Sequence, residues 1–100
     1  MKAKINNTIK TIQTTTEYFY QQKADKGFEN MENTIVSIGQ LVDELHQYKQ
    51  EHSDFVFDEN KVAQSLTEAL EAMQKGDTVL LADILEYDFI EYLQEVEASL

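Results

Sequence analysis

The chain has 100 residues, of which 42% are hydrophobic, and it carries a formal net charge of −11. This length and hydrophobic content are typical of one globular domain, so we expect a single domain over residues 1–100 rather than a disordered chain. The absence of cysteine excludes a disulfide framework, a thiolate zinc site and a cysteine nucleophile. There is no proline and there are only three glycines, which is too little turn punctuation for a β-sheet protein.

The negative charge is concentrated in the second half of the chain. Residues 1–50 contain six lysines and six acidic residues, whereas residues 51–100 contain two lysines and thirteen acidic residues. From Gly76 to the end there are seven acidic residues and no basic one. Nucleic acids and anionic membranes select positively charged surfaces, so the sequence predicts neither as a partner. A partner protein with basic residues fits this charge better.

The first helix is predicted from a stripe at alternating spacings of four and three, which is the period of one helix face. Its members are Ile5, Ile9, Ile12, Thr16 and Phe19. The β-branched threonines at 14–16 have low helix propensity, so this segment is expected to fray most readily. Tyr18 and Tyr20 flank Phe19, so at least one of these tyrosines is expected at the surface, where tyrosine is common in interfaces.

Gly27 is predicted to end the first helix, because glycine readily takes the left-handed conformation that closes many helices. The second helix then follows with the most regular stripe in the chain: Phe28, Met31, Ile35, Ile38, Val42 and Leu45. Gly39 lies inside this helix, and we expect a neighbouring helix to pack close to it. The alternative is one long helix over residues 3–50 in an extended three-helix form.

Asp58 is predicted to cap the third helix, with Phe57 and Val62 at the positions of a hydrophobic staple. Gly76 is expected to end that helix, and Asp77 to cap the fourth one residue later. So short a link predicts an antiparallel hairpin. The four helices together predict an all-α fold, an antiparallel up-down-up-down four-helix bundle.

The fourth helix is apolar on two sides. At about 100° per residue, its main face holds Leu81, Leu85, Phe89, Tyr92 and Val96, with Leu93 near the edge. Leu80, Ile84 and Tyr87 form a second, narrower strip on another side. Either this helix is central and buries both strips, or the second strip meets a partner.

No catalytic motif is recognisable, and we expect neither enzymatic activity nor a cofactor or metal. Asp43 and His46 have the carboxylate–histidine spacing of di-iron bundles, but the motif occurs once, so it is interpreted as exposed helix surface. His52 lies in a polar break and is expected in a loop. The first residues lack the apolar core of a signal peptide and no apolar run is long enough to cross a membrane, so the expected compartment is the cytoplasm.

Residues Asp77 to Asp88 contain the pattern Leu-Ala-Asp-hydrophobic-Leu-Glu-Tyr. This pattern resembles a segment of small uncharacterised acidic helical-bundle proteins of Gram-positive bacteria. The resemblance covers roughly the C-terminal half of the chain. It implies a bacterial helical bundle, and it implies no activity.

The sequence therefore suggests a non-enzymatic adaptor or chaperone-like module that binds a protein partner through its last helix. Leu80, Ile84 and Tyr87 are predicted to supply apolar contact. The acidic residues Asp83, Glu91 and Glu95 are predicted to speed encounter and set specificity. One alternative is an acidic nucleic-acid mimic that inhibits a DNA- or RNA-binding protein, and another is a homodimer in which the strips meet across a two-fold axis.

Overall fold

The structure is a computed structural model that describes all 100 residues, and every regular element in it is a helix. Helix α1 spans Lys2–Tyr20, α2 spans Ala24–Glu51 and α3 spans Glu59–Gln74. The last helix consists of three consecutive parts, α4 (Thr78–Asp83), the π-helical segment η1 (Ile84–Ile90) and α5 (Glu91–Ala98). The prediction of an all-α fold with four helices is confirmed.

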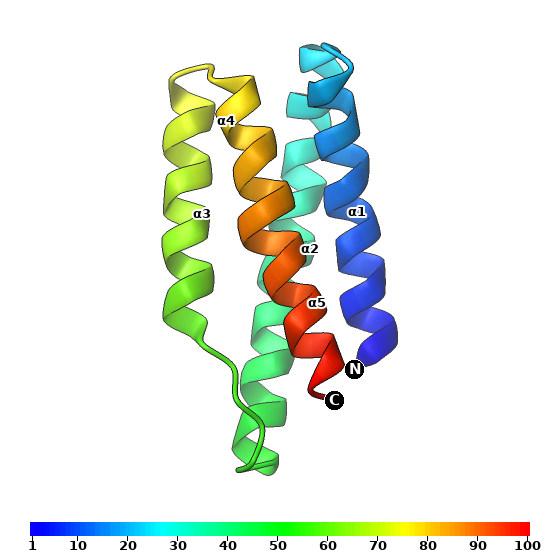
Figure 1. Ribbon diagram of the computed structural model, residues 1–100, viewed down its shortest axis with the longest axis vertical. Helices are drawn as coiled ribbons and strands as arrows, with labels where there is room; N and C mark the ends of the chain where they lie inside the picture. Colours follow the sequence, from blue (N-terminus) through cyan, green and yellow to red (C-terminus); the bar gives the residue numbers. More distant parts are fainter.

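The four helices lie side by side (Figure 1). Residues 21–23 and 75–77 link helices at one end of the molecule, and residues 52–58 and both termini lie at the other end. Because the chain leaves helical structure at residues 21–23, the alternative of one long helix over residues 3–50 is wrong. None of the helices combines the length and the hydropathy that crossing a bilayer requires.

The hydrophobic core fills the space between the helices, and the last helix contacts both α1 and α3. Each helix contributes side chains with almost no exposure: Ile5, Ile12, Met31, Leu45, Ala69, Leu81 and Leu85. Burying a large aliphatic side chain of this kind stabilises the fold by about 1.5–3 kcal/mol relative to leaving it in water. The core therefore supplies the main driving force for the arrangement.

Helix α1 continues through the threonine run at 14–16 without a break. Thr15 and Thr34 are fully buried, and their hydroxyl groups share a hydrogen bond of 2.8 Å between α1 and α2. The side-chain amide of Asn30 donates to the same Thr15 oxygen at 2.8 Å. A buried polar group is tolerated when its hydrogen bonds are made inside the protein. These contacts hold the threonine segment against α2.

Helix α1 ends at Tyr20, and the prediction that it ends at Gly27 is wrong. The left-handed residue after the helix is Gln22, with φ 61°. The backbone N–H of Lys23 donates to the carbonyl of Tyr18 at 2.8 Å, which closes the helix end as a Schellman motif. A glutamine therefore takes the left-handed position that was predicted for a glycine, and Gly27 lies inside α2.

The two glycines inside α2 have opposite surroundings. A Cβ atom built on Gly27 would lie 2.6 Å from Cδ1 and 2.7 Å from Cζ of Phe19, which is closer than carbon atoms pack. The Phe19 ring in turn stands edge-to-face against Phe28, with centroids 5.2 Å apart. Gly39 is exposed, and nothing lies within 4 Å of a Cβ atom built there. The close approach predicted at Gly39 occurs instead at Gly27, and it involves a ring of α1.

Replacing each of these glycines by alanine should change stability in opposite directions. Gly39→Ala should raise the free energy of unfolding by about 0.5–1 kcal/mol, because alanine loses less backbone entropy on entering a helix. Gly27→Ala should lower it by roughly 1–3 kcal/mol, because the Phe19 ring must leave its packed position. Urea denaturation followed by circular dichroism measures both. A stabilising Gly27→Ala would contradict the packing of Phe19 against this glycine.

The caps predicted around the third helix are confirmed. Asp58 accepts a hydrogen bond from the backbone N–H of Lys61 at 3.2 Å, and Asp77 accepts one from that of Leu80 at 3.1 Å. Gly76 has φ 68°, the left-handed conformation of a residue that follows a helix end. These contacts fix where α3 begins and ends and where α4 begins.

Residues 52–58 are held to the body of the molecule by aromatic side chains. Phe55 and Phe57 are buried, and Val56 between them points to solvent. The Phe57 ring stacks against Tyr92 of α5 with centroids 6.2 Å apart. The backbone N–H of Asp58 donates to the Tyr92 hydroxyl at 2.7 Å. This link between α2 and α3 is therefore fastened to the last helix.

The π-helical segment η1 allows apolar residues from both sides of the last helix to face the core. A π turn holds more residues than an α turn, since its hydrogen bonds join residues five apart. Residues 86–88 lie outside the core. The buried residues around them are Leu81, Ala82, Ile84, Leu85, Phe89, Ile90, Leu93 and Val96. Without one of residues 86–88, Leu81, Leu85, Phe89, Leu93 and Val96 would follow spacings of four, three, four and three, which is a regular α-helical stripe.

Deleting Tyr87 should therefore leave a folded protein. Removal of this exposed residue should convert η1 into α-helix with the core residues still facing inward, so cooperative thermal unfolding and the helical circular dichroism signal are expected to persist. Deleting Asn33, an exposed residue of the regular helix α2, is the control. That deletion rotates the residues after it by about 100° relative to those before it and should abolish cooperative unfolding. Equal loss of structure in both variants would contradict the role given to the π segment.

Candidate functional site

Two of the three apolar residues predicted on the surface of the last helix are exposed. Leu80 is 47% exposed and Tyr87 is 59% exposed. Ile84 is only 7% exposed and belongs to the hydrophobic core, so its prediction as a surface contact is wrong. The physical reason is that the last helix contacts α1 and α3 together, which covers its second apolar side around Ile84. The second strip is therefore divided between core and surface.

Tyr20 of α1 lies beside the residues predicted on the last helix. Its hydroxyl donates a hydrogen bond of 2.7 Å to Oδ1 of Asp83, and the residue is 48% exposed. Leu80 and Tyr87 are three residues before and four residues after Asp83, which is about one helical turn on either side. Glu86 is close enough to act electrostatically on Tyr20. We call Tyr20, Leu80, Asp83, Glu86 and Tyr87 the tyrosine–aspartate surface.

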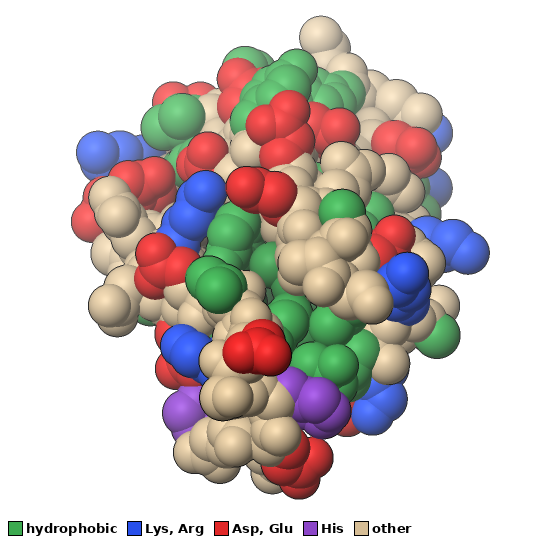
Figure 2. Space-filling model, turned by 60° about the horizontal axis from the view of Figure 1, so that its bottom comes forward, with side chains coloured by type: hydrophobic (Ala, Val, Ile, Leu, Met, Phe, Trp, Pro, Cys, Tyr) green, Lys and Arg blue, Asp and Glu red, His purple; other side chains and the backbone are tan.

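The acidic residues of the last helix have no basic partner. The molecule has two ion pairs, Lys4–Glu44 and His46–Glu59, and neither involves this helix. Glu91 and Glu95 are exposed, as predicted, and they continue the acidic surface along α5. In the space-filling view, acidic side chains border hydrophobic ones in the upper part of the face, and lysines lie toward its sides (Figure 2). The acidic residues near the tyrosine–aspartate surface therefore form no ion pair within the molecule.

The environment of Tyr20 favours its neutral form. Partial burial, the hydrogen bond to Asp83 and the negative charges of Asp83 and Glu86 raise the pKa of Tyr20 well above the ordinary value of tyrosine. The phenol therefore remains a hydrogen-bond donor through the whole neutral range. Its proton keeps α1 joined to the last helix at Asp83.

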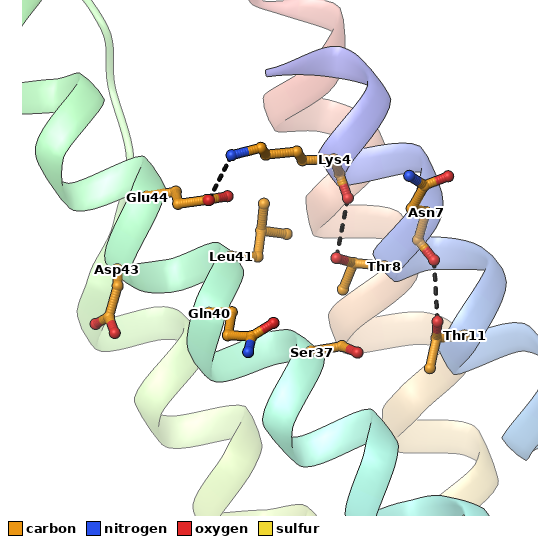
Figure 3. A pocket seen from close by; sticks show the side chains of 9 residues that line it. All are labelled: Lys4, Asn7, Thr8, Thr11, Ser37, Gln40, Leu41, Asp43 and Glu44. Carbon is orange, nitrogen blue, oxygen red and sulfur yellow. Dashed lines mark hydrogen bonds and ion pairs between the residues drawn. The ribbon is translucent and has the colours of Figure 1, made fainter.

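A polar groove lies between α1 and α2 (Figure 3), and its volume is about 560 Å³. The Lys4–Glu44 ion pair crosses the groove, and Leu41 is its only hydrophobic lining residue. The Thr8 and Thr11 hydroxyls donate to backbone carbonyls of their own helix and so offer no proton to a ligand. Small-molecule sites are mostly apolar with a few polar groups. This groove has the reverse composition, which makes the tyrosine–aspartate surface the stronger candidate.

The two histidines serve local contacts. His46 of α2 pairs with Glu59 of α3, at the end of the molecule where residues 52–58 link these helices. His52 stacks on the Tyr48 ring, with centroids 3.9 Å apart and planes inclined by 11°. No group of three histidine, cysteine or acidic side chains is placed to hold a metal ion. His46 therefore makes its contact between helices with Glu59 and not with Asp43.

Tyr20 should titrate at higher pH than an ordinary tyrosine side chain. In a spectrophotometric titration, the signal of one of the five tyrosines should appear above the ordinary range, and it should be lost in Tyr20→Phe. Asp83→Asn should lower this pKa toward the ordinary value of about 10. Because the pKa in the folded state is the higher one, the stabilising contribution of Tyr20 is complete below about pH 10 and is lost as the pH rises toward the folded-state pKa.

Tyr18→Phe is the matched control, since it removes a neighbouring tyrosine and should leave the late signal unchanged. Circular dichroism at each pH establishes that the protein is still folded. Titration curves of the unchanged protein and of Tyr20→Phe that coincide above the ordinary range would show that the bond between Tyr20 and Asp83 is absent in solution.

No curated protein and no solved structure matches the chain. One family model does match, and it covers residues 1–99. The match includes all four helices and every residue of the tyrosine–aspartate surface. The chain thus belongs to the family described as domain of unknown function DUF8042.

Proposed function

We propose that this protein is a non-enzymatic protein-binding module that holds its partner on the tyrosine–aspartate surface. The observation that carries the proposal is the exposure of Tyr20, Leu80 and Tyr87 beside carboxylates that form no ion pair. Neighbouring exposed apolar side chains are a common feature of sites that bind other proteins. Aromatic residues are enriched in such interfaces, since one ring supplies both apolar area and a polar edge.

The two kinds of side chain have different roles in this proposal. The rings of Tyr20 and Tyr87 and the side chain of Leu80 lose water on binding and supply most of the affinity. Exposed carboxylates such as Glu91 and Glu95 attract a basic partner over a distance and restrict the orientations in which it docks. Asp83 lies at the centre of the surface, where its hydrogen bond to Tyr20 holds it in place.

The proposal includes an antiparallel up-down-up-down bundle as the scaffold of this surface. The short links at residues 21–23 and 75–77 support it, because links of two to five residues join antiparallel neighbours. In such a bundle, the end of α1 lies beside the beginning of the last helix, and Tyr20 and Asp83 come from these two positions. Neither helix alone contains the complete surface.

The composition of the surface favours this function over the alternatives. A nucleic-acid mimic needs regularly spaced carboxylates in place of phosphates, whereas exposed leucine and tyrosine side chains interrupt the acidic residues here. In a two-fold homodimer, the same carboxylates would face one another across the interface. Like charges in that position oppose association. A different, basic protein is therefore the partner that we propose.

Affinity capture with three forms of the protein tests the proposal. The forms are the unchanged protein, the double variant Leu80→Ser with Tyr87→Ser, and the control Val36→Ser. Val36 lies on α2 and is 53% exposed, so the control removes a comparable exposed apolar side chain elsewhere. The double variant should retain at least about tenfold less of the specific partner, since interface aromatic and aliphatic anchors often contribute more than about 1.4 kcal/mol.

The Val36→Ser control should retain as much partner as the unchanged protein. Light scattering on the purified chain at low and moderate salt accompanies the experiment. Partner retained equally by all three forms would overturn the proposal. A stable homodimer that Leu80→Ser with Tyr87→Ser dissociates would overturn it in favour of the structural oligomer.

A further inference from the structure

We infer that the partner engages the centre of the tyrosine–aspartate surface with an arginine or lysine side chain. The cation would lie against the Asp83 carboxylate and the rings of Tyr20 and Tyr87. This inference rests on the function proposed above, and it goes further by naming the chemical group that the surface recognises.

One oxygen of the Asp83 carboxylate accepts no hydrogen bond from the protein. Oδ1 accepts the hydrogen bond from Tyr20, and no side chain or backbone group donates to Oδ2. Asp83 is also half-buried, so part of its hydration is already lost. Hydrogen bonds between a charged donor and a charged acceptor are about twice as strong as neutral ones, and the two oxygens of a carboxylate match the paired N–H groups of arginine. A guanidinium or ammonium group is thus the donor that completes this carboxylate.

The carboxylates that act on the Tyr20 hydroxyl, those of Asp83 and Glu86, are both negative. Glu86, like Asp83, is close enough to act electrostatically on Tyr20, and both negative charges disfavour a negative charge on its hydroxyl. No lysine or arginine follows Lys75 in the sequence, and no ion pair of the molecule reaches this surface. Carboxylates gathered without a counter-charge repel one another. A cation from outside the chain relieves that repulsion.

The neighbouring side chains suit the rest of a basic side chain. Tyrosine rings attract cations through their negative faces. The same protein already contains such a contact, because Nζ of Lys61 lies 4.6 Å from the centre of the Tyr92 ring. Arginine and lysine also carry long aliphatic stems that pack along apolar surface. Leu80 is placed to receive such a stem, one turn before Asp83.

Nuclear magnetic resonance titration tests the inference with small probes. N-acetyl-arginine amide is the cationic probe, and N-acetyl-citrulline amide has nearly the same shape without the charge. The arginine probe should give weak, saturable shifts centred on the amides of Tyr20, Asp83 and Tyr87, and the citrulline probe should not. Asp83→Asn should weaken the response about tenfold, the expected loss of one charge-assisted hydrogen bond.

Two further variants keep the result interpretable. Glu71→Gln removes an exposed carboxylate from α3 and should leave the arginine response unchanged. Tyr87→Leu keeps apolar area at its position but removes the ring, and it should weaken the response severalfold while the circular dichroism spectrum stays the same. Intact response in Tyr87→Leu or in Asp83→Asn would overturn the inference.

Equal shifts with citrulline, or shifts spread over the acidic residues of α3 and α5, would also overturn it. The proposed function is judged separately by affinity capture. Suppose that the double variant Leu80→Ser with Tyr87→Ser loses its partner while the arginine probe gives no shifts centred on Tyr20, Asp83 and Tyr87. In that case the protein-binding function stands and only the cation contact is rejected. If neither effect is found, both are rejected.

Discussion

The burial of the last helix against both α1 and α3 is the constraint on which the rest of the structure depends. This helix carries apolar residues on two sides, and burying each large one stabilises the fold by about 1.5–3 kcal/mol. A regular α-helix would present the Ile84–Leu85 pair and the Phe89–Ile90 pair in different directions. The π segment turns both pairs into the core, and it leaves residues 86–88 outside. The less favourable hydrogen-bond geometry of a π turn is offset by that burial.

The features that the sequence predicted well depend on neighbours in the chain. Asp58, Asp77 and Gly76 act at helix ends through backbone groups within four residues, so local pattern was sufficient. Gly27 was misplaced because its role depends on the Phe19 ring of another helix. The left-handed residue that follows α1, Gln22, carries no compositional signal, because a glutamine in this conformation is tolerated only when the surrounding structure holds it there. The π segment was missed for a related reason, since the assumed 100° per residue excludes it.

In the candidate site, too, features set by local pattern were predictable and features set by contacts between helices were not. The α-helical period placed Leu80 and Tyr87 in one strip with Ile84 and left open whether that strip is core or surface; in the structure Leu80 and Tyr87 are exposed. The burial of Ile84 depends on contacts that the last helix makes with two others, and no local pattern carries that information. Tyr20 was recognised as a candidate surface tyrosine, but its bond to Asp83 joins positions 63 residues apart. The available signal was the run of three aromatic residues at 18–20, which one helix cannot bury together.

The identity of the residue at position 20 bears on how the surface can act. A lysine in place of Tyr20 would hold Asp83 in position equally well, but its charge would neutralise the carboxylate and occupy the site proposed for a basic partner. The tyrosine hydroxyl is a neutral donor whose proton is retained throughout the neutral range. It therefore orients the carboxylate and leaves its negative charge intact. Groups fixed before binding lose less entropy when a partner arrives. The bond between Tyr20 and Asp83 thus joins two helices and also orients a carboxylate that forms no ion pair.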